Sequence, residues 1–90
     1  MKNEEEKVSK RDLVKGYGHI VIRKGYVGGK PALLERRISV RQILEGLSEG
    51  MTPNDFFDAY DIPAESVSEV LKFAAEFAGG QDVADRRKLA

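Results

Sequence analysis

Few side chains in this chain have the type and spacing that catalysis or metal binding requires. His19 is the one histidine among 90 residues, and the sequence has no cysteine. A lone imidazole beside a predicted strand, without a serine in a nucleophile turn, favours an ordinary surface residue over a general base or a metal ligand. The lack of cysteine excludes disulfides and thiolate metal sites. We therefore expect no catalytic residue, no metal site and no cofactor.

Two pairs of carboxylates and one glycine-rich segment are the other candidates for chemistry. Asp55 and Asp58 share one helical face, and Glu65 and Glu69 share another. No third type of ligand accompanies either pair, so solvated helix surface is the natural interpretation. Residues 25–30 contain glycines and a lysine, but lack the spacing and the following Ser or Thr of a phosphate-binding loop. These features do not predict an enzyme.

Basic side chains are concentrated in the first half of the chain. Residues 7–41 carry ten Lys and Arg against two carboxylates, whereas residues 42–90 carry ten carboxylates against four basic side chains. A basic half attracts phosphate, although the two halves can also neutralise each other within the fold or across a dimer. The candidates for phosphate or DNA contact, at the junction of the β and helical parts, are Lys30, Arg36, Arg37 and Arg41.

The elements that must position these side chains are a small β element and three helices. Short aliphatic runs at 20–22, 32–34 and 38–40 alternate with glycine and proline, which is typical of strands and turns. Helical spacing of apolar residues then predicts helices over about 40–49 and 64–78, with a third between them that ends near Tyr60. We expect a mainly α fold with a small β element, in which short N-terminal strands precede a trihelical, homeodomain-like helix-turn-helix bundle.

The chain is expected to form one domain over residues 17–78, with the β element at 17–39 and the helices at 40–78. Residues 1–16 are predicted to be a polar arm, either a short helix or a frayed segment, and residues 79–90 a flexible tail. No apolar run approaches the roughly 20 residues that span a bilayer, and the N-terminus lacks the apolar core of a signal peptide. We expect a cytoplasmic protein without membrane contact, and its small size favours a homodimer.

The second and third helices have the pattern of a helix-turn-helix. Thr52 as N-cap, Pro53 in the first helical position and Asp55 three residues after the cap predict a sharp helix start. Ile62 is expected to fill the angle between the two helices. The side chains expected to face the core from these two helices are Phe56, Phe57, Tyr60, Val67, Val70, Leu71, Ala74 and Phe77.

The charge of the last helix opposes DNA reading. The N-terminal and outward positions of a recognition helix face bases and phosphates, and here they include Glu65 and Glu69 with a single lysine, Lys72. Ser66 and Ser68 can hydrogen-bond a phosphate or a base, but the carboxylates repel the DNA backbone. Solvated surface is the favoured interpretation, and Ser66, Ser68 and Lys72 are the DNA-contact candidates on this helix.

Several short motifs follow one another in a specific order over about residues 17–77. They are Gly28-Gly29-Lys30-Pro31, Ile38-Ser39-Val40, Ile43-Leu44, Gly50-Met51-Thr52-Pro53 and Phe73-Ala74-Ala75-Glu76. Their order and spacing resemble the small prokaryotic family called domain of unknown function 433 (DUF433). The resemblance implies a short β element with a homeodomain-like trihelical bundle, often dimeric. It also implies a relation to antitoxins of the VapB kind, which bind PIN-like nuclease toxins and commonly repress their own operon.

One motif departs from the family pattern. Where the family usually has Arg-Gly-Thr-Arg before the Ile-Ser-Val stretch, this chain has Leu34-Glu35-Arg36-Arg37. Glycine supports a tight turn that needs a positive φ, and Glu or Arg does not favour that conformation. We therefore expect a remodelled turn at residues 34–37.

The favoured functional interpretation is a non-enzymatic, antitoxin-like interaction protein that binds a PIN-like nuclease toxin and autoregulates transcription. The alternatives are a helix-turn-helix regulator that binds double-stranded DNA without a toxin partner, and a structural dimer module. In the antitoxin interpretation the tail binds the toxin, and an arginine enters a carboxylate-lined nuclease site. The partner-binding candidates are Val83, Arg86, Arg87, Lys88 and Leu89.

Overall fold

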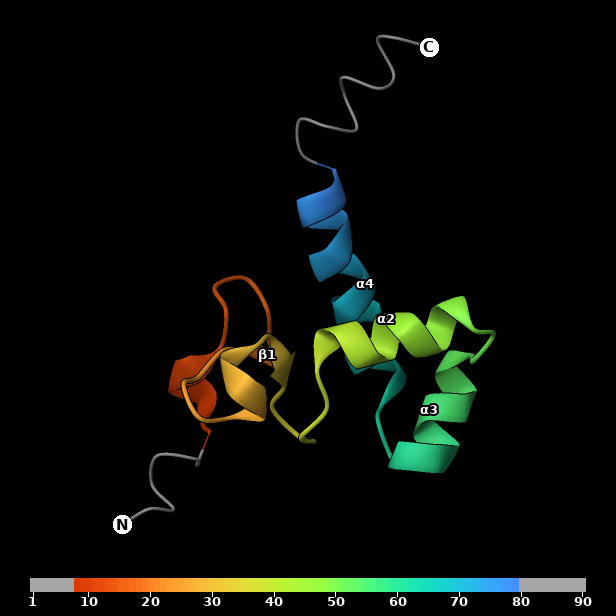
Figure 1. Cartoon of the computed structure of the whole chain (residues 1–90), viewed down its shortest axis with the longest axis horizontal. Coiled ribbons are helices and arrows are strands. Elements are labelled where there is room, and N and C mark those ends of the chain that lie inside the picture. The colour runs from red at the N-terminus through yellow and green to blue at the C-terminus, as the bar shows by residue number, and fades with distance from the viewer. Residues whose placement is uncertain (1–7, 80–90) are drawn as a thin grey trace, which may run out of the picture.

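The computed structural model describes residues 8–79. Two short strands, β1 (Ile20–Val21) and β2 (Ala32–Leu33), precede three α-helices, α2 (Val40–Ser48), α3 (Pro53–Tyr60) and α4 (Ala64–Ala78) (Figure 1). Short 3₁₀ turns lie at η1 (Lys10–Asp12) and η2 (Val27–Gly29). The fold is mainly α, with a small antiparallel β element ahead of a three-helix bundle, as the sequence predicts.

The β element separates two apolar clusters. β1 pairs with β2 in the register Ile20 with Leu33 and Val21 with Ala32. Successive side chains of a strand point to opposite faces. Ile20 and Leu33 therefore join the main core with the helices, whereas Val21 and Ala32 pack on the other side around the buried ring of Tyr26.

The third aliphatic run, at residues 38–40, does not form a full strand. Ser39 makes an isolated bridge to Ala32 and then caps α2, accepting a hydrogen bond from the backbone N–H of Gln42 at 3.0 Å. Residues 8–16, expected within a polar arm, include η1 and a bridge between Leu13 and Val21. Residues 1–7 lie outside the described part of the chain.

The N-terminus of α3 has the predicted capping box, and the turn between α3 and α4 contains the predicted buried Ile62. Thr52 Oγ1 accepts from the N–H of Asp55 at 3.2 Å, and Asp55 Oδ2 accepts from the N–H of Thr52 at 2.8 Å. Such a capping box contributes about 1 kcal/mol to stability. Asp61 ends the helix in the left-handed region, at φ 62°, and Ile62 is fully buried between α3 and α4.

The turn at residues 34–37 forms without left-handed backbone. In residues 8–79, the non-glycine residues with positive φ are Val27 and Asp61. The phenol oxygen of Tyr26 lies 2.8 Å from the carbonyl oxygen of Leu33 and 3.1 Å from that of Arg36. A buried tyrosine therefore spans a turn in which no residue needs a positive φ.

The predicted inward faces of α3 and α4 were partly wrong. Four side chains expected in the core are exposed: Phe57 by 54%, Tyr60 by 48%, Leu71 by 48% and Phe77 by 74%. On α4 the predicted Val67 and Val70 are buried, and Ser66 and Phe73, which were not predicted to face the core, are buried with them. The β element covers the flank of α4 that carries Phe73, where the Tyr17 ring packs edge-on at 5.3 Å. This contact turns the buried face away from Leu71, and spacing within the helix alone does not reveal it.

The two adjacent phenylalanines of α3 give a direct test of this packing. We expect Phe56→Ala to lower the free energy of unfolding by about 3–5 kcal/mol, because its ring is 1% exposed in the main core. Phe57→Ala removes the same side chain from an exposed position and is expected to change it by at most about 0.5 kcal/mol. Urea unfolding followed by circular dichroism measures both. Equal effects of the two substitutions would contradict the assignment.

Candidate interaction site

Carboxylates of α4 hold the loop that enters β1. Glu69 accepts from the backbone N–H of Gly18 at 2.9 Å through Oε2, and from that of His19 at 2.8 Å through Oε1. About two turns further along α4, Glu76 Oε1 accepts from the hydroxyl of Tyr17 at 2.6 Å. Burial of the phenol, and then this hydrogen bond, raise the pKa of Tyr17 to about 12. Of the pair Glu65 and Glu69, predicted to be solvated surface, Glu69 therefore has a structural contact and the prediction is wrong for it, whereas Glu65 is 81% exposed.

His19 lies among three carboxylates. Its Nδ1 is hydrogen-bonded to Glu35 Oε2, and its Nε2 lies 3.8 Å from Glu65 Oε1. The hydrogen bond that the imidazole donates to Glu35, followed by the charges of Glu35, Glu69 and Glu65, raises the pKa of His19 above 6.5 against the opposing effect of burial. Within residues 8–79, no group of three or more His, Cys, Asp or Glu side chains is arranged to hold a metal ion. The arrangement is an ion-pair cluster between the β element and α4.

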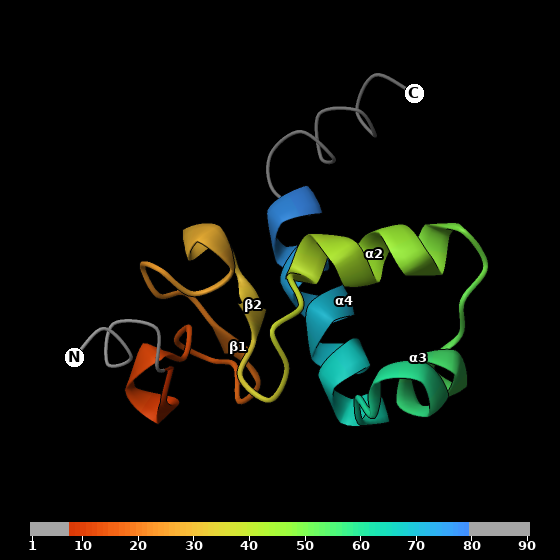
Figure 2. The ribbon, with the colours of Figure 1, turned by 60° about the horizontal axis from the view of Figure 1, so that its bottom comes forward.

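The structure does not gather the DNA-contact candidates of α4 on one open face. Ser66 is fully buried, with Oγ 3.5 Å from Glu35 Oε1, because the β element lies against this side of the helix (Figure 2). The expectation that Ser66 faces outward was therefore wrong. Lys72 lies over the Tyr17 ring at 5.5 Å, while Ser68 is exposed.

Three of the four basic candidates at the junction are bound within the molecule. Arg36 donates from Nε to the carbonyl oxygen of Tyr60 at 3.0 Å and from Nη2 to Asp61 Oδ2 at 2.9 Å. Arg37 lies over the Tyr26 ring at 5.0 Å. Arg41 pairs with Glu45 at 3.1 Å, and Lys30 is exposed. The sequence gives no signal for the role of Arg36, which ties the β element to the C-terminus of α3.

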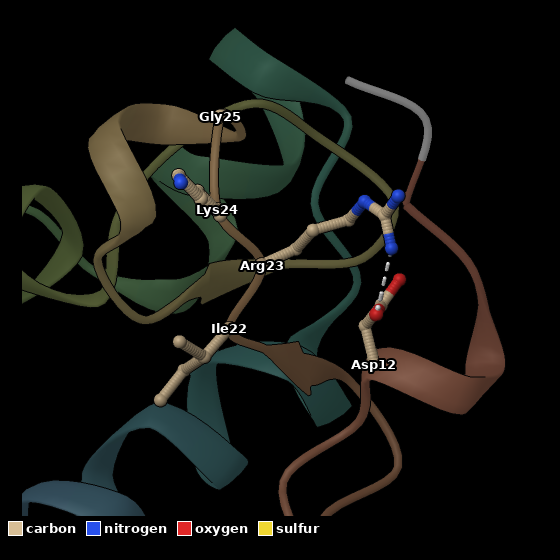
Figure 3. Close-up of a pocket in the computed structure, with 5 residues that line it drawn as sticks. All are labelled: Asp12, Ile22, Arg23, Lys24 and Gly25. Atoms are coloured by element: carbon tan, nitrogen blue, oxygen red, sulfur yellow. Dashed lines mark hydrogen bonds and ion pairs between the residues drawn. The ribbon is translucent and has the colours of Figure 1, made fainter. Parts of the chain in front are cut away.

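A hollow of about 530 Å³ lies beside β1 but lacks converging groups. Figure 3 shows Arg23 reaching towards Asp12, whose carboxylate is 3.2 Å from Arg23 Nη1, while Ile22 and Lys24 point away from that pair. Gly25 completes the lining. A site for a small ligand needs a few polar groups aimed at one point. This hollow does not have that geometry.

A second hollow, the α2–α3 groove, has an apolar floor and an acidic rim. Its volume is about 230 Å³, and its apolar lining comes from Ile38, Met51, Phe56 and Tyr60. Gly46 also lines it, and a Cβ there would lie 2.8 Å from Phe56 Cζ, so glycine allows α2 and α3 to approach closely. The carboxylates of the rim are Glu45 and Glu49. The sequence does not reveal this groove, because residues from three separate segments form it.

Three aromatic side chains are exposed on α3 and α4, and one of them packs against a buried ring. Phe73 packs edge-on against Phe77 at 5.0 Å, and Phe77 is the most exposed of the large apolar side chains in the described part of the chain. Phe57 and Tyr60 are exposed on α3. The tail candidates Val83, Arg86, Arg87, Lys88 and Leu89 lie outside the described residues.

These features define a small helical domain with a β element, and the described part of its surface carries exposed apolar and acidic side chains. A profile of the family described as "Protein of unknown function (DUF433)" matches residues 20–74. The chain belongs to this family, as its motifs indicated. No curated protein and no solved structure matches the chain significantly. Within residues 8–79, no helix has the length and apolar character needed to cross a membrane.

The contact between Glu69 and the loop before β1 can be tested with an isosteric change. Glu69→Gln keeps one acceptor oxygen but turns an amide N–H₂ towards a backbone N–H, so we expect the free energy of unfolding to fall by about 1–2 kcal/mol. Glu65→Gln is the matched control, because its side chain is 81% exposed, and a change of at most about 0.5 kcal/mol is expected. Urea unfolding measures both, and a Glu69→Gln midpoint equal to that of the wild type would refute the contact.

The raised pKa of His19 predicts a pH-dependent stability. The folded state holds the imidazole proton more tightly than the unfolded state, so this contribution is fully present below pH 6.5 and is lost as the pH rises through the folded-state pKa. We expect the unfolding midpoint of the wild type to fall across that window. His19→Gln should flatten this part of the profile. A slope that persists unchanged in His19→Gln would assign the effect to other groups.

Proposed function

We propose that this chain is a non-enzymatic protein-binding module that acts like the antitoxin half of a toxin–antitoxin pair, with a PIN-like nuclease as its partner. One observation carries the proposal. Part of the side of α4 that a DNA-reading helix would use, at Glu69 and the buried Ser66, is covered by the β element, while the rings of Tyr60 and Phe77 remain exposed. Aromatic side chains on a surface favour protein contacts.

The electrostatics also favour a protein partner over DNA. A DNA-binding surface needs several cations free to replace counterions along the phosphate backbone. Arg36 and Arg41 already contact carboxylates of this chain, and Glu65 lies exposed at the N-terminal end of α4. On α4, Glu69 is engaged by the backbone N–H groups of Gly18 and His19 and is not free to contact DNA.

The geometry around the histidine supports a non-enzymatic role. Both nitrogens of the His19 ring face carboxylates, and the raised pKa favours the charged form, which is a poor general base. The hydroxyl of Ser66, which also lies against Glu35, is buried. The contacts of the imidazole thus link the β element to α4.

Inhibition of a PIN-like nuclease from the same host tests the proposal. We expect an equimolar amount of the full chain to reduce RNA cleavage by that nuclease at least about tenfold, with a stable complex in size-exclusion chromatography. Phe77→Ala should raise the concentration needed, because an exposed aromatic ring is a typical anchor of an interface. Ile22→Ala, at another exposed apolar position, is the matched control.

Two results would overturn the proposal. One is the absence of both a complex and inhibition with every PIN-like nuclease of the host. The other is tight binding to the DNA upstream of its own gene, with an affinity that falls steeply as salt is raised, which would favour the helix-turn-helix regulator.

A further inference from the structure

The α2–α3 groove has the size and lining of a site for one or two side chains. Its volume of about 230 Å³ is smaller than the roughly 300–1,000 Å³ of sites that enclose small-molecule ligands. Ile38 and Met51 are partly exposed in it, and Tyr60 presents 48% of its surface to solvent. An aliphatic side chain placed there would cover apolar area on three segments at once.

The rim of the groove selects for positive charge. Glu45 and Glu49 stand one helical turn apart on α2 and both line the groove. Arg41 is the cation that the described contacts place beside them, and it touches Glu45. The rim therefore keeps a net negative charge. The exposed face of the Tyr60 ring adds a surface on which a guanidinium can stack.

Contacts within the chain fix the residues that line the groove, so the groove exists without a bound partner. Arg36 fixes the end of α3 through the carbonyl oxygen of Tyr60 and the carboxylate of Asp61. The Tyr60 ring packs on Phe56 at 6.1 Å, and Gly46 brings α2 against the same Phe56 ring. A preformed site loses little conformational entropy on binding, so even a short segment can occupy it.

This chain itself carries a segment of complementary chemistry. Residues 86–89 read Arg-Arg-Lys-Leu, with three cations next to an aliphatic side chain, and Val83 precedes them. The segment follows α4, whose C-terminal end points away from α3 in both views (Figures 1 and 2). That end of α4 is therefore turned away from α3, which forms one wall of the groove. A second copy can present it directly.

We propose that the chain self-associates by placing residues 83–89 of one copy in the α2–α3 groove of a second copy. Leu89 packs between Ile38 and Met51, and the basic side chains of residues 86–88 meet Glu45 and Glu49. The exchange is reciprocal, so two copies close into a symmetric dimer. This inference is independent of the proposed function, because it requires neither a toxin nor DNA.

Charge exchange in the full chain tests the proposal by sedimentation velocity. The wild type is expected to dimerise. The tail variant Arg86→Glu/Arg87→Glu and the groove variant Glu45→Lys/Glu49→Lys should each self-associate at least about tenfold more weakly, because like charges then meet. An equimolar mixture of the two variants should dimerise again, since each tail then finds a groove of opposite charge.

The control reverses two carboxylates outside the groove, Asp58→Lys/Glu65→Lys, and should dimerise like the wild type. Circular dichroism and urea unfolding of every variant separate loss of association from loss of fold. A wild type that stays monomeric at all concentrations overturns the proposal. So does a mixture that stays monomeric, which would indicate a tail bound within its own copy or not at all. A groove variant that dimerises normally also refutes the assignment.

Discussion

The Glu69 carboxylate accepts hydrogen bonds from two consecutive backbone N–H groups, and this contact holds the β element against α4. Hydrogen bonds to an ionised acceptor are about twice as strong as neutral ones. The loop they fix brings Tyr17 over Phe73 and extends β1 into the main core. The two-residue strands depend on such contacts with the helices and on the burial of Ile20 and Leu33 in the main core, because an isolated hairpin is at best marginally stable in water.

Several charged side chains form ion pairs with one another within the molecule. The basic first half and the acidic second half meet through specific pairs, such as Arg36 with Asp61, as well as through carboxylates that bind backbone N–H groups. Arg36 also reaches a carbonyl at the C-terminus of α3, where a cation is favoured by the helix dipole. The basic and acidic halves of the sequence thus contribute side chains that pair with each other within the fold.

Local chemistry made the helices and the caps predictable. The Thr52-Pro53-Asp55 pattern acts within four residues, and the observed capping box follows it. The faces of α3 and α4 were less predictable, because the burial of Phe73 and the exposure of Leu71 depend on where the β element docks. Contacts between residues about 50 positions apart, such as those of Glu69 with Gly18, leave no periodic signal in the sequence. The same holds for the α2–α3 groove.

The contacts between Tyr17 and Glu76 span 59 residues, and those of Gly18 and His19 with Glu69 span 51 and 50. During synthesis the β element leaves the ribosome first, yet the groups that anchor it are among the last of the domain to be made. The helices have local contacts and can form as they emerge, whereas the β element must wait for α4. A chain interrupted before Glu69 would therefore keep the contacts of Arg36 with the end of α3 but lack those of Tyr17, Gly18 and His19 with α4.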